Sequence, residues 1–451
     1  MANYPQAFID LMDQKFKEEK NAFWESLSLN ANTSIRLNPF KTNVIPKLDP
    51  VAWNPQGYYV PQDTKFVSDP WWHAGAYYVQ EASSMFLSYA LQPFLEKLNN
   101  PLVLDLCAAP GGKSTLLATE IWKKNGFLVA NEVMSNRIGS LQENISKWGL
   151  PNTVVTNKDA AFWGKKGPLF DMVLVDAPCS GEGMFRKDPN AILQWNDNSP
   201  QHCALRQQSI LQDILPALKH GGILVYSTCT FNDKENKQNL DFFESLGVEW
   251  QPIPLDDTFG VTQEGKGYSF YPHKVKGEGF FIAVGILNKE VQIAFKTIHK
   301  PILKEFQNPF KGLNLKENWF CTLFENEIKI ANSQMLETFS PLLGFMDIRK
   351  ILWNWAEKKG NDFIPHYQSA FCSSIVCENI QLSELSHEEA LKYLRKEDPG
   401  VHTEKGYKLV AYQNIPLGWI KNLGNRNNNL YPSQWRILSH RYDKEVFNML
   451  A

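Results

Sequence analysis

The chain has 451 residues, of which 43% are hydrophobic and 21% charged, and a formal net charge of −2. This length predicts two or three domains, and the hydrophobic content is that of a soluble protein with an ordinary core. The start of the chain lacks the cationic-then-apolar pattern of a signal peptide, and no apolar run approaches the roughly 18 residues that span a bilayer.

The seven cysteines are scattered, odd in number and free of CxxC pairs or Cys/His ligand spacings. A secreted disulfide framework has denser, even-numbered cysteines, and a structural zinc site needs closely spaced ligands. We therefore predict a reduced, cytoplasmic protein with no metal site and no membrane segment.

Residues 5–28 are expected to form an amphipathic helix, and strands and helices then alternate. The predicted strands are 101–107, 127–133, 153–160, 171–180 and 222–230. The helices between them include 134–150, ending near Gly149, and 201–219, ending at Gly221-Gly222. This rhythm predicts a parallel sheet of βαβ units, and the continuous apolar runs indicate strands covered on both faces. A late strand is expected at 279–287, antiparallel at the edge, and a linker at 358–368.

The segment LDLCAAPGGKS (104–114) places a glycine-rich turn between the first strand of the sheet and a helix. Ligands of such sheets bind outside the carboxyl ends of the strands, and Gly111 and Gly112 let the backbone approach a ligand. The turn matches neither GxGxxG nor the phosphate-binding GxxxxGK[ST] loop. Taken alone, it is a weak signal for a cofactor site.

Three acids close successive strands of the predicted sheet: Glu132, Asp159 and Asp176. An unpaired charge at a strand end costs free energy unless a ligand or another group compensates it. The structural alternative is that these acids cap the helices that follow. An acidic mouth repels phosphate-rich cofactors and suits the positive sulfonium of S-adenosylmethionine. We predict that Glu132 holds the ribose diol and that Asp159 lies near the adenine amino group.

Cys179 follows the fourth strand of the sheet and Cys229 ends the fifth. If these strands are neighbours, both thiols face one pocket, whereas the alternative is that they are two small buried hydrophobic residues. A thiolate that adds to carbon 6 of cytosine turns carbon 5 into a nucleophile able to take a methyl group. Asp176 would hold or protonate the ring at N3. Spacing does not decide which cysteine attacks.

The residues around these positions resemble the RNA cytosine-C5 methyltransferase family, which includes the RsmB, RsmF and Nop2/Sun proteins. The resemblance covers most of residues 1–288, and the combination of PCSGEG with STCT is its most specific part. The matching segments are SIRLNP (34–39), YYVQEASSM (77–85), DLCAAPGGK (105–113), NEVMSNRIGSLQENISKWG (131–149), VDAPCSGEGMFRKDP (175–189), YSTCTFNDKEN (226–236) and FYPHKVKGEGFFIA (270–283).

The resemblance implies that Cys229 is the nucleophile and that Cys179 assists release of the enzyme from its product. The chemistry at N3 makes Asp176 the third candidate catalytic residue. It also implies a set of residues that bind S-adenosylmethionine. These are Cys107, Ala108, Ala109, Pro110, Gly111, Gly112, Lys113, Glu132, Arg137, Asp159 and Asp176.

Residues 406–437 resemble the terminal PUA-like domain of the RsmF type, whose relatives modify 16S ribosomal RNA of the small subunit. Residues 405–451 hold seven Lys or Arg and two acids, a net charge of +5 that suits phosphate contacts. Trp419, Arg426 and Trp435 are candidates for RNA contact, although burial of at least one Trp in a small β-barrel is the alternative.

We therefore expect an α/β fold in which a Rossmann-like methyltransferase sheet joins a small N-terminal α+β subdomain and a C-terminal PUA-like β-barrel. The expected divisions are 1–95 for an N-terminal RNA-binding subdomain, 96–288 for the catalytic domain, 289–380 for an intermediate domain and linker, and 381–451 for the PUA-like domain. One complete site within one chain favours a monomer acting on 16S ribosomal RNA within the small subunit. The alternatives are a transfer RNA substrate and a non-catalytic RNA-binding assembly factor, whereas the STCT cysteine disfavours a DNA methyltransferase.

Overall fold

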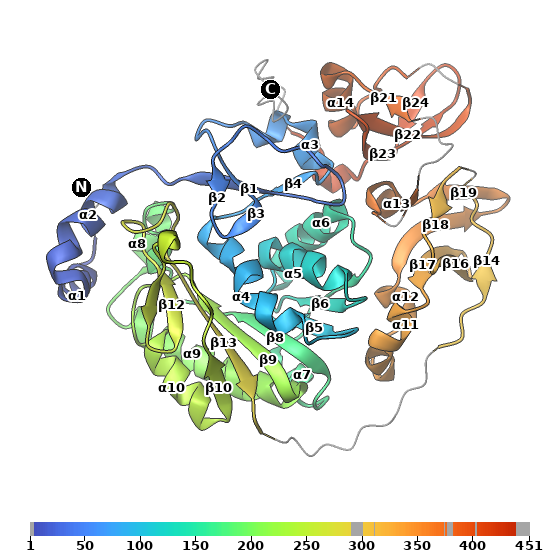
Figure 1. Ribbon diagram of the computed structural model, residues 1–451. Coiled ribbons are helices and arrows are strands. Elements are labelled where there is room, and N and C mark those ends of the chain that lie inside the picture. Colours follow the sequence, from blue (N-terminus) through green and yellow to red (C-terminus); the bar gives the residue numbers. More distant parts are fainter. Residues whose placement is uncertain are drawn as a thin grey trace.

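The structure is a computed structural model that describes residues 4–289, 301–310, 312–373, 375–376, 382–401 and 404–438. Figure 1 shows a central sheet, an N-terminal segment on one side of it, and two smaller β-containing parts that follow along the chain. Arg441 and Lys444 of the basic tail lie outside the described residues. No helix among the described residues is long and apolar enough to cross a membrane.

The N-terminal part begins with two helices rather than one. The expected helix over 5–28 is interrupted at Lys17, whose φ of +42° does not fit a helix, and a 3-10 turn follows. A four-stranded antiparallel sheet comes next, in the order β2-β3-β1-β4. The elements are α1 (Gln6–Phe16), α2 (Lys20–Ser28), β1 (Thr33–Leu37), β2 (Pro50–Val51), β3 (Asn54–Val60), α3 (Pro70–His73), β4 (Tyr77–Val79) and α4 (Phe86–Leu95).

The central sheet has nine strands in the order β11-β12-β13-β9-β8-β5-β6-β7, with β10 also paired to β13. Five of them are parallel, which confirms the predicted Rossmann-like class: β5 (Leu102–Asp105), β6 (Phe127–Asn131), β7 (Thr153–Thr156), β8 (Phe170–Asp176) and β9 (Leu218–Thr228). The chain runs outward from β5 through β6 and β7, then returns to β8 and β9. The strand order therefore reverses between β5 and β8, where such sheets bind ligands.

The remaining strands of this sheet are antiparallel: β10 (Val248–Gln251), β11 (Thr262–Glu264), β12 (Gly267–Phe270) and β13 (Phe280–Leu287). The late strand predicted over 279–287 is antiparallel as expected. Its predicted place at the edge is wrong, because β12 and β10 pair with its outer side. The closing strands extend the sheet beyond β9, so β9 has a neighbouring strand on each side. Cys229 directly follows the last residue of β9.

The helices that connect these strands are α5 (Gly112–Trp122), α6 (Ile138–Trp148), α7 (Ala160–Gly164), α8 (Pro189–Gln194), α9 (Ser199–Ile214) and α10 (Lys237–Ser245). Helix α6 ends at Gly149 in the left-handed conformation, as predicted. The predicted end of the helix at Gly221-Gly222 is wrong, because α9 stops at Ile214 and Pro216 follows in a 3-10 turn. Proline supplies no N–H for the helix ladder, and both glycines lie within β9.

The intermediate part is a five-stranded sheet in the order β14-β16-β17-β18-β19. The linker predicted over 358–368 is wrong. That stretch forms the β18–β19 hairpin, turning at Gly360 with φ +61°, and the start of α13. The elements are β14 (Glu305–Phe306), β15 (Asn314–Leu315), β16 (Trp319–Phe324), β17 (Glu327–Asn332), α11 (Met335–Thr338), α12 (Ile348–Ile351), β18 (Trp353–Lys359), β19 (Asp362–Pro365), α13 (Tyr367–Phe371) and β20 (Ile375–Val376).

The C-terminal part is a four-stranded sheet that packs against the N-terminal part. Its elements are β21 (Ser383–Glu384), α14 (His387–Leu394), β22 (Gly406–Tyr412), β23 (Ile415–Asn422) and β24 (Asn427–Asn429). Trp71 and Tyr77 share one buried apolar cluster with Leu391 and Trp435, and His387 Nε2 lies 2.9 Å from the Ser68 carbonyl. Residues more than 300 positions apart therefore form one core, and Figure 1 shows the C-terminal part beside α3.

Candidate active site

The predicted site lies where the carboxyl ends of β5, β8 and β9 meet at the point of strand-order reversal. Strands β8 and β9 are parallel neighbours, with Asp176 paired opposite Ser227. The Ala177 N–H donates to the Ser227 carbonyl at 2.8 Å, so the pairing continues one residue past β8. The two cysteine loops therefore leave the sheet side by side.

Cys179 and Cys229 face each other across these loops. Their sulfurs are 2.9 Å apart, and the Cys229 N–H donates to Cys179 Sγ at 3.3 Å. Both are free thiols. Hydrogen bonding to Cys229 raises the pKa of the Cys179 thiol well above its usual value, and burial and the nearby Glu235 carboxylate act in the same direction. A raised pKa favours Cys179 as the protonated partner of the pair.

The two loops are closely packed against each other. Ser180 Oγ and Thr230 Oγ1 are 2.8 Å apart, and the Gly183 N–H donates to the Cys229 carbonyl at 2.9 Å. A Cβ atom added at Gly183 would lie 2.7 Å from Gly279 Cα and 2.8 Å from the Cys229 carbonyl oxygen. Glycine is needed at position 183 because of this close approach, whatever its backbone angles.

Two buried carboxylates, Glu182 and Glu235, accept hydrogen bonds from these loops. The sequence alone did not single them out. Glu182 accepts from the Phe231 N–H at 3.0 Å and from Trp195 Nε1 at 3.2 Å. Glu235 accepts from the Ser180 N–H at 3.0 Å. Both side chains are fully buried, and burial raises the pKa of each. Both lie inside motif segments, but only the tertiary structure shows where their side chains point.

Asp176 forms an ion pair with Lys113 beside the thiols. Lys113 Nζ donates to Asp176 Oδ2 at 2.9 Å, and Ser227 Oγ donates to Asp176 Oδ1 at 2.7 Å. Burial alone would lower the pKa of Lys113, but the charge and hydrogen bond of Asp176 outweigh it, so this pKa is raised. Each Asp176 oxygen accepts one of these hydrogen bonds and keeps a lone pair for a further partner.

The glycine turn predicted to bind the cofactor connects β5 to α5. Gly111 has φ +115° and precedes the first residue of α5. Arg137 Nη2 donates to the Ala109 carbonyl, and Asn144 Nδ2 donates to the Pro110 carbonyl at 2.8 Å. Helix α6 and the 3-10 turn before it thus hold the backbone of the turn in a fixed shape. The Cys107 thiol lies in the same turn, and burial raises its pKa.

The predicted acids at the strand ends differ in their surroundings. Glu132 is buried, with Oε1 accepting from the Met134 N–H at 2.8 Å and Oε2 lying 3.2 Å from Arg137 Nη1. Asp159 is exposed, and its Oδ1 accepts from the Phe162 N–H at 2.7 Å. The capping alternative therefore accounts for Asp159 without a cofactor.

Asp105 is a further acid at this site, and its position in the sequence does not by itself mark it as a site residue. Its Oδ2 accepts from Ser114 Oγ at 2.6 Å, whereas its buried Oδ1 has no hydrogen-bond partner among the described residues. Burial raises the pKa of this carboxyl to about 7. An unpartnered buried acceptor at the end of the first parallel strand fits a ligand that donates hydrogen bonds.

Arg36 connects the N-terminal sheet to the same turn. Its buried guanidinium donates to Thr115 Oγ1 at 2.7 Å and to the Gly112 carbonyl at 3.3 Å, and it stacks on Trp148 with Cζ 4.3 Å from the ring centroid. Burial lowers its pKa to about 9. The SIRLNP segment therefore packs directly against the start of α5.

The aromatic residues proposed for RNA contact are buried. Trp419 is 3% exposed and donates through Nε1 to Ser369 Oγ at 3.0 Å, and Trp435 is 8% exposed. Neither ring can stack on a base, because both pack into cores shared with other parts of the chain. Arg426 is exposed and stays a candidate for phosphate contact.

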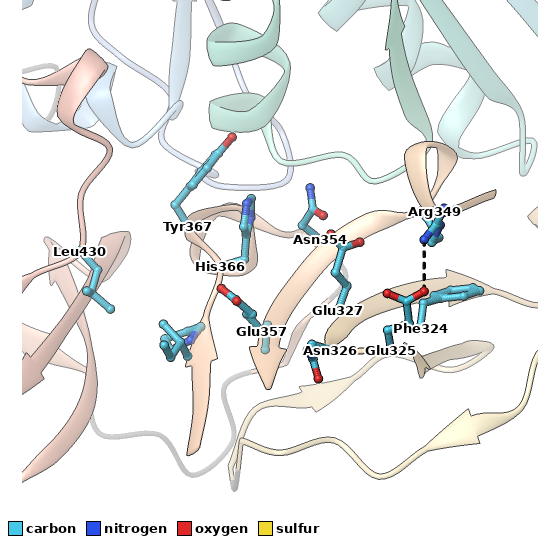
Figure 2. Close-up of a pocket in the computed structure, with 13 residues that line it drawn as sticks. Phe324, Glu325, Asn326, Glu327, Arg349, Asn354, Glu357, His366, Tyr367 and Leu430 are labelled. Atoms are coloured by element: carbon cyan, nitrogen blue, oxygen red, sulfur yellow. Dashed lines mark ion pairs between the residues drawn. The ribbon is translucent and has the colours of Figure 1, made fainter. Parts of the chain in front are cut away.

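A cavity of about 650 Å³ lies elsewhere, in the intermediate part, and it includes none of the predicted site residues. Figure 2 shows its lining from β17–β19 and neighbouring turns, with the carboxylates of Glu325, Glu327 and Glu357 and the Arg349–Glu325 ion pair. Three carboxylates disfavour a phosphate-bearing ligand there. The cavity therefore adds nothing to the chemistry at the two thiols.

Three family models match the chain. The model described as 16S rRNA methyltransferase RsmB/F matches residues 92–285. The N-terminal domain of 16S rRNA methyltransferase RsmF matches residues 4–82, and the methyltransferase RsmF PUA domain matches residues 381–437.

Curated proteins of similar length also match. Ribosomal RNA small subunit methyltransferase F of Erwinia tasmaniensis is 31% identical over 96% of each chain. The protein of that name from Vibrio cholerae is 32% identical over 89% of this chain and 90% of its own. A solved methyltransferase homologue from Pyrococcus horikoshii is 28% identical with a TM-score of 0.53, over 63% of this chain and 96% of its own. The chain belongs to the 16S rRNA methyltransferase RsmB/F family and, within it, to the RsmF group of S-adenosylmethionine-dependent RNA methyltransferases.

Proposed function

We propose that this protein methylates carbon 5 of a cytosine in 16S ribosomal RNA, with Cys229 as the nucleophile and Cys179 as the cysteine that assists product release. The observation that carries the proposal is the 2.9 Å approach of the two sulfurs at the ends of adjacent parallel strands. Both thiols lie beside the Lys113–Asp176 ion pair at the switch point of the sheet. Two cysteines with a purely structural role would not need an adjacent ion pair or a position at the switch point of the sheet.

Carbon 5 of cytosine is too weak a nucleophile to take a methyl group unaided. The Cys229 thiolate adds to carbon 6, which forms a carbon–sulfur bond and moves electron density to carbon 5. S-adenosylmethionine, when bound, would supply the methyl group that carbon 5 takes and would leave as S-adenosylhomocysteine. A base removes the proton from carbon 5, the carbon–sulfur bond breaks, and the Cys229 thiolate is regenerated.

Two further residues are assigned to these steps. Cys179 lies within contact of Cys229 Sγ and is assigned to the elimination, in which the carbon 5 proton leaves and the enzyme is released. Asp176 lies beside the thiols and is assigned to the ring nitrogen N3, where holding or donating a proton makes carbon 6 more electrophilic. The hydrogen bonds from Lys113 and Ser227 hold the carboxylate in place and leave a lone pair on each oxygen for the base.

The residues at the glycine turn fit S-adenosylmethionine. Asp105 offers a buried acceptor that has no partner within the described part of the chain, and Glu132 offers a carboxylate held near Arg137, while Gly111 and Gly112 leave the backbone open. We assign cofactor binding to residues 107–113 together with Glu132, Arg137, Asp159 and Asp176. The two acids Asp105 and Glu132 favour a cationic, phosphate-free ligand.

We assign the substrate class from the family, whose curated members are named ribosomal RNA small subunit methyltransferases. We place the reaction in the cytoplasm, where free thiols stay reduced. A monomer suffices, because every residue assigned to the chemistry comes from one chain. The division into parts at 1–95, 96–288, 289–380 and 381–451 is proposed on the same basis, with the first and last parts contacting RNA.

The proposal is tested by methyl transfer from labelled S-adenosylmethionine to unmethylated small ribosomal subunits, naked 16S RNA and bulk transfer RNA in parallel. A Cys229→Ala variant runs beside the wild type, and nucleoside analysis identifies the product. 5-Methylcytosine in ribosomal RNA, absent with the variant, supports the proposal. Label only in transfer RNA overturns the substrate class, and cofactor binding without transfer to any RNA overturns the activity.

A further inference from the structure

Glu235 is a buried carboxylate in contact with both cysteine loops. The proposed reaction does not use this carboxylate. Each of its three partners donates a hydrogen bond to it: the Ser180 N–H at 3.0 Å, Asn232 Nδ2 at 2.7 Å and Gln207 Nε2 at 2.7 Å. A carboxylate out of water is tolerated only when such donors replace the water. All three hydrogen bonds therefore require that the side chain at position 235 present only acceptor oxygens to these donors.

Two of these donors lie on the cysteine loops, one on each, and Gln207 lies in α9. Ser180 directly follows Cys179, and Asn232 lies three residues after Cys229. Gln207 also donates to the carbonyl of Pro178, the residue before Cys179, at 3.0 Å. The backbone on each side of Cys179 is thus fixed through Gln207 and Glu235, and the same carboxylate holds the loop of Cys229.

We propose that Glu235 is a positioning residue that sets the approach of the Cys179 and Cys229 sulfurs. Glutamine at this position places an amide N–H₂ among donors, so at least one of the three hydrogen bonds must break. The loop after Cys179 then moves relative to Cys229. The consequence for catalysis rests on the proposed function, whereas the consequence for the distance between the thiols does not.

The first experiment compares how readily the two thiols meet in the wild type and in the variant, without RNA. Diamide takes two electrons and two protons from a pair of thiols to form a disulfide and a reduced hydrazine, and its rate reports how often the sulfurs meet. Peptide mapping follows the Cys179–Cys229 link, with Cys179→Ala as the blank. We expect Glu235→Gln to form this link at a rate reduced roughly 10-fold or more, since small misplacements have large effects on reaction rates between held groups.

The second measurement follows single-turnover methyl transfer with saturating RNA and cofactor. We expect the rate with Glu235→Gln to fall roughly 10- to 100-fold, with the cofactor Kd and the RNA KM close to those of the wild type and a somewhat lower melting temperature, because a buried hydrogen bond is lost. Glu96→Gln removes one carboxylate from an exposed position and is the matched control, with wild-type values expected throughout. A purely structural role for Glu235 would lower the melting temperature and leave both rates of the folded protein unchanged.

Glu235→Asp is the second variant, because it keeps the charge and withdraws the carboxylate by one methylene. A folded Gln or Asp variant that forms the link at the wild-type rate overturns the proposal. Failure of both variants to fold assigns Glu235 to stability alone and also overturns it. If the wild type methylates no RNA, the proposed function fails, and the crosslinking rates still decide the positioning role.

Discussion

Arg186 and Glu278 form a buried, two-pronged ion pair between the Cys179 loop and the segment before β13. Arg186 Nε lies 3.0 Å from Glu278 Oε2 and Arg186 Nη2 lies 2.6 Å from Glu278 Oε1, with side chains 4% and 3% exposed. Arg186 Nη1 also donates to the Ser26 carbonyl at 3.0 Å, at the end of α2. One guanidinium therefore links three segments that lie far apart in the sequence.

Replacing Arg186 with Met should destabilise the protein strongly, because Glu278 would stay buried without its partner. Breaking a buried pair in this way costs about 3–5 kcal/mol of unfolding free energy. Urea denaturation of the variant measures the change. Lys20→Met, which breaks the exposed Lys20–Asp13 contact at 3.7 Å, is the control and should cost about 0–1 kcal/mol; equal losses in the two variants would contradict the prediction.

Cys179→Ala should leave nucleophilic attack possible and slow the release of the product. We expect a covalent protein–RNA adduct that survives denaturing electrophoresis, because Cys229 remains next to the bound base. Cys229→Ala and the double variant should form no adduct. An adduct with Cys229→Ala would exchange the roles of the two cysteines.

Gly183→Ala should disturb the cysteine loops directly. The added methyl group would meet backbone atoms of Gly279 and Cys229 at 2.7 and 2.8 Å, and overpacking of this kind costs about 1–3 kcal/mol. Thermal unfolding and methyl transfer should both decline. Gly139→Ala in α6 meets no atom within 4 Å and should be neutral or stabilising by up to about 1 kcal/mol, so a similar loss there would show that packing at Gly183 is not the cause.

Asp105 should make the stability of the cofactor-free protein fall as pH rises. Burial raises the pKa of this carboxyl to about 7 in the folded state, against about 3.9 in an unfolded chain. Between these values the folded state binds more protons than the unfolded state, so the unfolding free energy declines from about pH 4 to about pH 7.

Lys113, Asp176 and Glu132 also face this site, so Asp105→Asn is compared with the wild type across the pH range. The variant keeps an acceptor for Ser114 and loses the titration. We expect it to gain stability relative to the wild type as pH rises, by roughly 3–4 kcal/mol at most, and to bind the cationic cofactor more weakly. Parallel stability curves from pH 4.5 to 8 would rule the prediction out.

Arg36→Lys should weaken cofactor binding without removing charge. Lysine lacks the planar fork that reaches Gln80, Gly112 and Thr115 together, and such sites do not accept the exchange. We expect the cofactor Kd to rise roughly 10-fold, equivalent to about 1.4 kcal/mol. Titration calorimetry measures it, and an unchanged Kd in a folded variant would show that the turn keeps its shape without Arg36.

The sequence by itself determined the class of the central sheet and the positions of the candidate catalytic motifs. Strand–helix alternation, the Gly111-Gly112 turn and the stop at Gly149 depend on residues close together in the chain, so their patterns can be read directly. Such patterns gave wrong predictions where two local signals for different structures lay close together in the chain. Pro216 ended α9 before the glycines, and the β18–β19 hairpin formed where a polar stretch suggested a linker.

Only the tertiary structure decided which side chains meet. The sulfurs of Cys179 and Cys229, 50 positions apart, come within 2.9 Å because β8 and β9 are adjacent. The burial of Trp419, the Asp105 oxygen that has no partner among the residues the structure describes, and the donors around Glu235 likewise depend on distant segments packing together. Sequence patterns specify local conformation. Burial and hydrogen-bond partners depend instead on residues that are distant in the sequence and come into contact only when the chain folds.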